Sequence, residues 1–149
     1  FLASQAAVRS MAQTGGGSIV NIVSLAGVVP DLTSIAYGTS KAAIIYLTKQ
    51  IAVQAARANI RCNSVAPGMT ATDAVKKYVT AEFQEFFLRH TPIKRLAEPE
   101  EMAAAVLYFL GDESAFTTGQ NITLSGGFGL AQPTFADMLA MAGSQLEGQ

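Results

Sequence analysis

Hydrophobic positions along the chain follow two patterns that alternate from one end to the other. Apolar residues three or four positions apart predict helices over residues 1–13, 35–58 and 99–110. Short continuous apolar runs predict buried strands over residues 18–23, 60–66 and 120–124. Because parallel strands are covered on both faces by the helices that connect them, this order predicts an α/β fold with a parallel sheet.

Three apolar stripes mark the helix faces that we expect to pack on the sheet. The first consists of Phe1, Ala7, Val8, Met11 and Ala12. The second consists of Ala43, Ile44, Leu47, Ile51 and Ala55. The third consists of Met102, Ala103, Val106, Leu107 and Leu110. Each stripe occupies one side of its helix, as is typical of a helix that covers a sheet.

The ends of these elements carry residues that stop or start regular structure. Glycines at 15–17 end the first helix, and Pro67 ends the second strand. Pro99 opens the last helix and Gly111 ends it, which is the usual placement of proline and glycine. The intervening segment 24–34 is expected to be a loop because it contains Gly27, Pro30 and Asp31.

Two segments lie outside this alternation. Residues 74–95 are rich in aromatic side chains and are expected to be helical; they include Tyr78, Phe83, Phe86 and Phe87. Residues 128–149 form a loosely patterned C-terminal extension. Two roles stay open for it, since it could cap a neighbouring subunit or be disordered.

Composition excludes several classes of protein. Of the 149 residues, 50% are hydrophobic and 14% are charged, against about 25% charged in an average domain, so one domain with a substantial core is expected. Ten basic and eleven acidic residues provide no electrostatic footprint for nucleic acid or an anionic membrane. Two long stretches, residues 10–30 and 114–136, carry no charged side chain. Both are interrupted by polar residues, so neither matches the roughly 20 apolar residues of a membrane span.

The chain holds one cysteine and one histidine, and neither is expected to act chemically. Cys62 excludes an internal disulfide and a zinc site built on cysteine pairs, and it favours a reducing, cytoplasmic setting. Its place in an apolar strand suggests a small buried side chain. His90 has no partners at a metal-binding or triad spacing, so we expect a surface residue at the end of the aromatic helix and no metal site.

Tyr37 and Lys41 are the first residues that suggest chemistry. A separation of four places them on one face of a helix, one turn apart. A phenol is a poor acid or base near neutral pH, and an ammonium group about 4–6 Å away favours the phenolate form. The pair could therefore exchange a proton with an alcohol or carbonyl oxygen. On its own the spacing also fits an ordinary solvated helix face.

Two further features place this pair in a possible site. Ser24 follows the first predicted strand, and Pro67-Gly68 follows the second. In open α/β sheets, ligands bind outside the carboxyl ends of the strands. The serine, the tyrosine–lysine pair and the Pro-Gly turn are therefore expected at one edge of the sheet.

Taken together, these segments resemble the second half of a short-chain dehydrogenase/reductase. The resemblance runs from Phe1 to about Gly127 and is carried by IVNIVSLAG (19–27), YxxxK (37–41), IRCNSVAPG (60–68), TGQ (118–120) and GG (126–127). It implies a Rossmann-like, doubly wound parallel sheet, a dimer or tetramer, and NAD or NADP as cofactor. The implied reaction is hydride transfer that interconverts a secondary alcohol and a ketone.

The resemblance also assigns roles to residues. Tyr37 would be the general acid/base and would also contact the cofactor, and Ser24 would bind and polarise the substrate oxygen. Lys41 would stabilise the tyrosinate and hold the ribose hydroxyls of the nicotinamide. The remaining cofactor contacts would come from Pro67, Gly68, Met69, Thr70 and Thr72, the last through its hydroxyl. Residues 74–95 would form a substrate lid, whose apolar character fits a largely apolar alcohol or ketone as the small-molecule substrate.

The chain departs from the family at its beginning. The glycines at 15–17 follow a helix and precede a strand, which is the reverse of the strand-to-helix turn that binds a pyrophosphate. We therefore expect residues 1–149 to be the C-terminal part of a single domain, with roughly 100 residues of a typical member not present. The alternative is a truncated, non-catalytic module that interacts through its helix surfaces.

Overall fold

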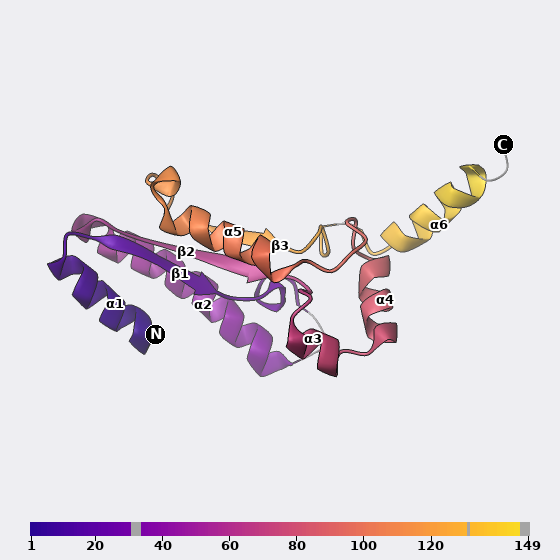
Figure 1. Ribbon diagram of the computed structural model, residues 1–149, viewed down its shortest axis with the longest axis horizontal. Coiled ribbons are helices and arrows are strands. Elements are labelled where there is room, and N and C mark those ends of the chain that lie inside the picture. The colour runs from indigo at the N-terminus through magenta and orange to yellow at the C-terminus, as the bar shows by residue number, and fades with distance from the viewer. Residues whose placement is uncertain (31–33, 131, 147–149) are drawn as a thin grey trace.

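The computed structural model describes residues 1–30, 34–130 and 132–146 (Figure 1). Asp31, expected in a loop, lies outside these residues. The helices are α1 Leu2–Gln13, α2 Ile35–Ala55, α3 Asp73–Tyr78, α4 Ala81–Arg89, α5 Pro99–Leu110 and α6 Phe135–Leu146. The strands are β1 Gly17–Ile22, β2 Ile60–Pro67 and β3 Asn121–Leu124. Three short 3₁₀ turns are η1 Leu25–Gly27, η2 Ala56–Ala58 and η3 Asp112–Ser114.

The three strands form one parallel sheet in the order β1-β2-β3. Gly17 of β1 pairs with Ile60 of β2, and Pro67 at the end of β2 pairs with Leu124 of β3. The predicted α/β fold with a parallel sheet is therefore confirmed. Because the strands are parallel, their carboxyl ends meet at one edge, on the side where α3 and α4 lie in Figure 1.

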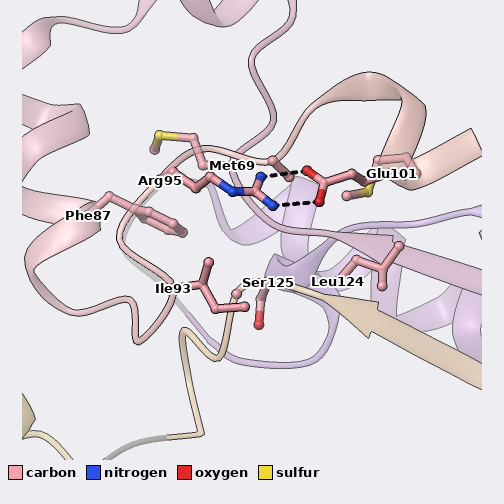
Figure 2. A pocket seen from close by; sticks show the side chains of 10 residues that line it. Met69, Phe87, Ile93, Arg95, Glu101, Leu124 and Ser125 are labelled. Carbon is pink, nitrogen blue, oxygen red and sulfur yellow. Dashed lines mark hydrogen bonds and ion pairs between the residues drawn. The ribbon is translucent and has the colours of Figure 1, made fainter.

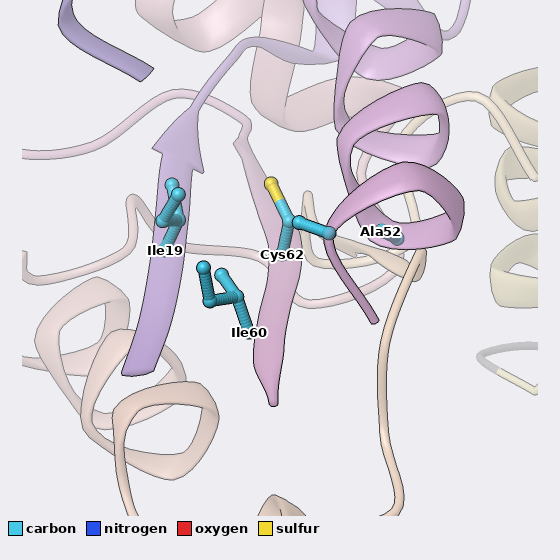
Figure 3. Close-up of a cluster of buried hydrophobic side chains, with 5 residues drawn as sticks. Ile19, Ala52, Ile60 and Cys62 are labelled. Atoms are coloured by element: carbon cyan, nitrogen blue, oxygen red, sulfur yellow. The ribbon is translucent and has the colours of Figure 1, made fainter. Parts of the chain in front are cut away.

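Helices cover both faces of the sheet. In Figure 1, α1 and α2 lie on one side of it and α5 on the other. Between the sheet and α2 is a cluster of buried side chains, shown in Figure 3, made of Ile19, Ala52, Ala55, Ile60 and Cys62. Burial of a large aliphatic side chain contributes about 1.5–3 kcal/mol, so this cluster holds α2 firmly against β1 and β2.

On the opposite face, Arg61 joins β2 to the C-terminal end of α5. Its guanidinium donates hydrogen bonds to the carbonyls of Phe109 and Gly111 and to the hydroxyl of Ser114, at 2.8, 3.0 and 2.8 Å. Carbonyls in the last turn of a helix have no partner within the helix and carry the negative end of its dipole. The cation therefore satisfies both needs of the helix end.

The stripe predicted for the second helix is partly wrong. Ala55 is buried as expected, but Ala43 is exposed, and the other fully buried positions of α2 are Thr48 and Ala52. The hydroxyl of Thr48 donates to the carbonyl of Ile44 and accepts from the amide of Asn21. Since α2 carries apolar residues on nearly all sides, its periodicity does not identify the buried face.

The stripe predicted for the last helix is also partly wrong. Leu107 is 67% exposed and Leu110 is exposed, whereas Phe109, which the stripe omits, is fully buried. The helix does begin at Pro99 and end before Gly111, as expected. As with α2, apolar residues lie on nearly all sides of the helix. The sequence pattern therefore does not show which side of α5 faces the sheet.

The aromatic segment is helical but divided. Thr72 and Thr80 each act as an N-cap, and their hydroxyls accept hydrogen bonds from the backbone N–H groups of Val75 and Phe83. The second cap starts a new helix, so α3 and α4 replace one continuous element.

The C-terminal extension contains the helix α6, which points away from the sheet (Figure 1). The ring of Phe135, its first residue, lies 5.3 Å from the ammonium of Lys94. Within the described ranges, no helix combines the length and the apolar character needed to cross a membrane.

The single thiol is expected to be unreactive in the folded protein. Cys62 is fully buried, and burial raises its pKa from a usual value near 9.0 to about 11, partly opposed by a hydrogen bond with Thr48. A pKa of about 11 leaves roughly 100-fold less thiolate at pH 8 than a pKa near 9 does. Dithionitrobenzoate should therefore react at least about 100-fold faster with the urea-unfolded chain than with the folded protein.

The same pKa difference sets a pH dependence for stability. The pKa of Cys62 is higher in the folded protein than in the unfolded chain. The contribution of the protonated thiol to the free energy of unfolding is therefore fully present below about pH 9 and is lost as the pH rises through 11. Equal thiol reaction rates in the folded and unfolded states would contradict the assignment of Cys62 to the core.

Candidate active site

Ser24 lies just beyond the carboxyl end of β1, where the chain leaves the sheet. Its backbone is extended, and it caps the turn η1, because its Oγ accepts a hydrogen bond of 3.2 Å from the N–H of Ala26 within that turn. The oxygen therefore acts as an acceptor toward the protein. The hydroxyl proton remains able to donate to another oxygen.

Tyr37 and Lys41 occupy the first two turns of α2. Ser34 caps this helix by accepting a hydrogen bond from the N–H of Tyr37 at 3.3 Å. The Nζ of Lys41 lies 5.6 Å from the centroid of the Tyr37 ring and donates to the carbonyl of Ile22 at 3.2 Å. Lys41 thus connects the tyrosine to the last residue of β1, and the 46% exposed Tyr37 stays accessible to a ligand.

Two glycines allow the serine turn to approach this helix closely. A Cβ on Gly27 would lie 2.7 Å from the backbone carbon of Lys41, and one on Gly38 would lie 3.0 Å from the carbonyl oxygen of Ala26. The turn that begins at Ser24 therefore packs directly on the part of α2 between Tyr37 and Lys41. The structure thus brings the predicted serine turn and the predicted pair together.

The segment 67–72 follows β2 at the same edge. Gly68 donates its N–H to the carbonyl of Leu124 at 2.8 Å, which holds the segment against the end of β3. Thr70 is buried, and its hydroxyl donates to the carbonyl of Gly68. Thr72 caps α3 and keeps its hydroxyl proton available, because its oxygen only accepts in that bond.

A cavity of about 150 Å³ lies beside this segment (Figure 2). Met69, Phe87 and Ile93 supply apolar lining, and Arg95 and Glu101 supply an ion pair. Arg95 donates two hydrogen bonds to Glu101, at 2.6 and 2.7 Å, and the N–H of Glu98 donates a third. These donors, Arg95 first, lower the pKa of Glu101 to about 2, so the pair stays ionised near neutral pH.

Sequence reasoning did not anticipate this cavity or the ion pair. Arg95 lies before α5 and Glu101 within its first turn, so helical spacing does not connect them. The carbonyl of Ile22 was also missed as a partner of Lys41, since a backbone acceptor leaves no mark in the side-chain pattern. Only the packing of α2 on the sheet brings that carbonyl and the ammonium together.

His90 is the C-cap of α4, as its predicted place at the helix end implies, but it is half-buried and not a surface residue. Its ring meets that of Phe86 edge-on, with centroids 5.3 Å apart. Within the part of the chain that the structure describes, no group of three or more His, Cys, Asp or Glu residues could hold a metal ion.

The fold and this edge define a class: a Rossmann-type parallel sheet with a tyrosine–lysine pair where its strands end. A family model described as enoyl-(acyl carrier protein) reductase matches residues 1–129. The chain belongs to the short-chain dehydrogenase/reductase family. The resemblance inferred from the motifs, and the Rossmann-type fold that it implied, are therefore confirmed.

Three relatives illustrate the similarity. The 7alpha-hydroxysteroid dehydrogenase of Clostridium sardiniense is 47% identical over 92% of this chain and 52% of its own length. A structure of 7alpha-hydroxysteroid dehydrogenase with NADH and 7-oxo glycochenodeoxycholic acid superposes with a TM-score of 0.80 at 38% identity, over 84% of this chain and 49% of the other. A gluconate 5-dehydrogenase from Burkholderia cenocepacia, with NADP and tartrate, gives 0.82 at 31% identity, over 87% and 51%.

These matches cover most of this chain but only part of each relative. The chain spans about half the length of the curated relatives that it matches. Residues 1–149 are therefore sufficient to establish membership of the family, whereas the activity of the whole protein is proposed below.

Proposed function

We propose that the protein is an NAD(P)-dependent oxidoreductase that interconverts a secondary alcohol and a ketone. The observation that carries the proposal is the close packing of the turn that begins at Ser24 on the part of α2 that holds Tyr37 and Lys41, at the carboxyl edge of the sheet. Each of the three offers a hydrogen-bond donor, and the edge is where open α/β sheets bind ligands.

The three side chains divide the proton chemistry among them. In the direction of reduction, the Ser24 hydroxyl donates a hydrogen bond to the substrate carbonyl oxygen, and Tyr37 transfers its phenolic proton to that oxygen. The Lys41 ammonium, 5.6 Å from the ring, stabilises the negative charge left on Tyr37. A nicotinamide dinucleotide, when bound, supplies the hydride that adds to the carbonyl carbon. The C=O bond, one hydride and one proton together become CH–OH.

The donor set around Lys41 fits the nicotinamide end of such a cofactor. An ammonium group has three N–H bonds, and the one given to the carbonyl of Ile22 leaves others for ribose hydroxyls. Thr72 has a free hydroxyl proton for a carboxamide or phosphate oxygen. Pro67, Gly68 and Met69 would contribute backbone contacts. Thr70 would do the same, because its hydroxyl proton is already given to Gly68. The choice between NAD and NADP stays open.

The proposed substrate is a largely apolar small molecule. Phe87 and Ile93, which line the cavity beside Met69, favour an apolar molecule. Two of the relatives described above are 7alpha-hydroxysteroid dehydrogenases, and one of these holds an oxo bile acid. A 7alpha-hydroxysteroid and its 7-oxo counterpart are therefore the first pair to test.

The outer surface of α2 supports the proposed homodimer or homotetramer. Ile35, Tyr46 and Val53 are all exposed, the last to 78%, although they belong to a helix whose other side is in the core. Large apolar side chains gathered on one exposed helix face are typical of a surface that meets another subunit.

The test is a spectrophotometric assay on the native protein that contains residues 1–149. Absorbance at 340 nm would be followed with NADH and with NADPH, using 7-oxo bile acid as oxidant, and glycerol and gluconate with the oxidised cofactors as comparisons. We expect turnover with one cofactor preferred. If neither cofactor supports turnover with any of these compounds or with simple secondary alcohols, the proposal is wrong and the non-catalytic module becomes the better hypothesis.

A further inference from the structure

The helices α3 and α4 belong to one excursion that leaves the sheet edge and returns to it. At its base, the N–H of Ala97 donates to the carbonyl of Met69 at 3.1 Å, and the carbonyl of Ala97 accepts from Ala71 at 2.8 Å. These bonds hold the outgoing and returning segments together. The position of the helices themselves must then depend on contacts farther out.

The turn that follows β3 holds the returning segment. Gly126 accepts a hydrogen bond of 2.9 Å from the N–H of Ile93, and it has a φ of +63°. Gly127 has a φ of +90°, and a Cβ there would lie 2.7 Å from the ring of Pro92. Glycine is needed at 127 both for this backbone conformation and for this close approach. The turn is therefore packed directly against the excursion.

Phe128, the next residue, makes an aromatic contact with α4. Its ring stacks on that of Phe87 with centroids 4.1 Å apart and planes 6° from parallel. The backbone of Phe128 is itself fixed, because its N–H donates to the carbonyl of Ser125 and its carbonyl accepts from the Ser125 hydroxyl. A rigid turn thus presents a flat ring to the side of α4, whose C-terminal carbonyls at Leu88 and Arg89 also accept hydrogen bonds from Lys94.

Each ring of this pair also lines a cavity at the carboxyl edge. Phe87 lines the cavity beside Met69, as Figure 2 shows. Phe128 lines a second, apolar cavity of about 300 Å³, together with Val28 and Leu25, the residue that follows Ser24. A displacement of α4 would therefore change the cavity that Phe87 lines, next to the segment 67–72, whereas Phe128 connects this contact to the cavity beside the serine turn.

We propose that Phe128 is a positioning residue: its ring holds α4 in place through Phe87 and so sets the apolar space that a substrate enters. The substrate part of this inference rests on the proposed function. The mechanical part does not, because the stacked pair and the rigid turn are independent of any reaction.

Hydrogen exchange of the native protein, followed by mass spectrometry, tests the mechanical part. Phe128→Leu keeps an apolar side chain but removes the flat face, and we expect amides of α4 to exchange about 10-fold faster. Phe128→Tyr keeps the ring and should restore the original rate. Phe116→Leu makes the same change at a fully exposed ring, and it should leave α4 unchanged.

Two outcomes would overturn the proposal. One is an exchange rate in α4 within about twofold of the wild type for Phe128→Leu; the other is equal acceleration by Phe128→Tyr. If Phe128→Leu also accelerates exchange in β1 and β2, the substitution has destabilised the whole fold. The test then passes to Phe87→Leu, which removes the other ring of the pair and should accelerate exchange in α4. The double variant should then exchange no faster than either single one, since both changes break one contact.

Kinetics test the substrate part. With Phe128→Leu, the KM for a bulky apolar ketone should rise about 10-fold, while kcat with a small ketone such as acetone stays unchanged. An equal fall in kcat/KM for the bulky and the small ketone would contradict a role in substrate positioning. If the wild-type protein reduces no ketone, the proposed function fails, whereas the exchange result still decides whether Phe128 holds α4.

Discussion

Replacing Tyr37 by phenylalanine is expected to lower kcat/KM for ketone reduction by about 10²- to 10⁴-fold, the usual contribution of a positioned general acid. The change removes one oxygen and its proton while the ring and the helix remain. The affinity for the cofactor should fall much less, because the contacts from Lys41 and the segment 67–72 remain and only a contact from the Tyr37 hydroxyl is lost. Steady-state kinetics of the native protein and the variant, together with a cofactor titration, measure both effects.

Tyr46→Phe is a matched control in the same helix. Its hydroxyl is on the exposed side of α2 and accepts a hydrogen bond from Gln50 at 3.0 Å. The same atom is removed, so activity should stay within about twofold if proton transfer belongs to Tyr37. Near-normal turnover of Tyr37→Phe would show that the proton comes from elsewhere, and the proposed mechanism would be lost.

Replacing Arg61 by methionine is expected to lower the free energy of unfolding by about 2–4 kcal/mol. Methionine keeps much of the apolar stem, so the loss comes mainly from the hydrogen bonds. The carbonyls of Phe109 and Gly111 would lose a charged donor at the end of α5, where the helix dipole favours a cation. The midpoint of urea unfolding, at an unchanged slope, measures the effect.

Arg57→Met makes the same chemical change at an exposed position in η2. A surface substitution of this kind should alter stability by no more than about 0.5 kcal/mol. If the two variants unfold at the same urea concentration, the contact between Arg61 and the end of α5 contributes little. The packing of α5 on the sheet would then depend mainly on the burial of Phe109.

Much of the fold was predictable because local residues decide where elements begin and end. Pro99 and Gly111 bound α5 as expected, and the apolar run from Ile60 became β2 with Pro67 as its last residue. The parallel sheet followed from the order of helices and strands. These features depend on backbone preferences and on burial, which a single stretch of sequence expresses directly.

The candidate site was predictable in its members and less so in its partners. Ser24 and the Tyr37–Lys41 pair could be placed at one edge, because the carboxyl ends of parallel strands coincide there. The carbonyl of Ile22, which accepts from Lys41, could not be predicted. Backbone acceptors are present at every residue, so nothing in the side-chain pattern distinguishes the one that is used.

What the sequence by itself determined is therefore the class of fold, the extents of its main strands and helices, and the helical spacing of tyrosine and lysine. Tertiary structure alone decided which sides of α2 and α5 are buried, because both helices are apolar nearly all round. It also decided that Phe87 meets Phe128 and that Arg61 reaches the end of α5. A local pattern specifies a period along the chain, whereas such contacts depend on how separate elements are rotated and aligned in the packed molecule.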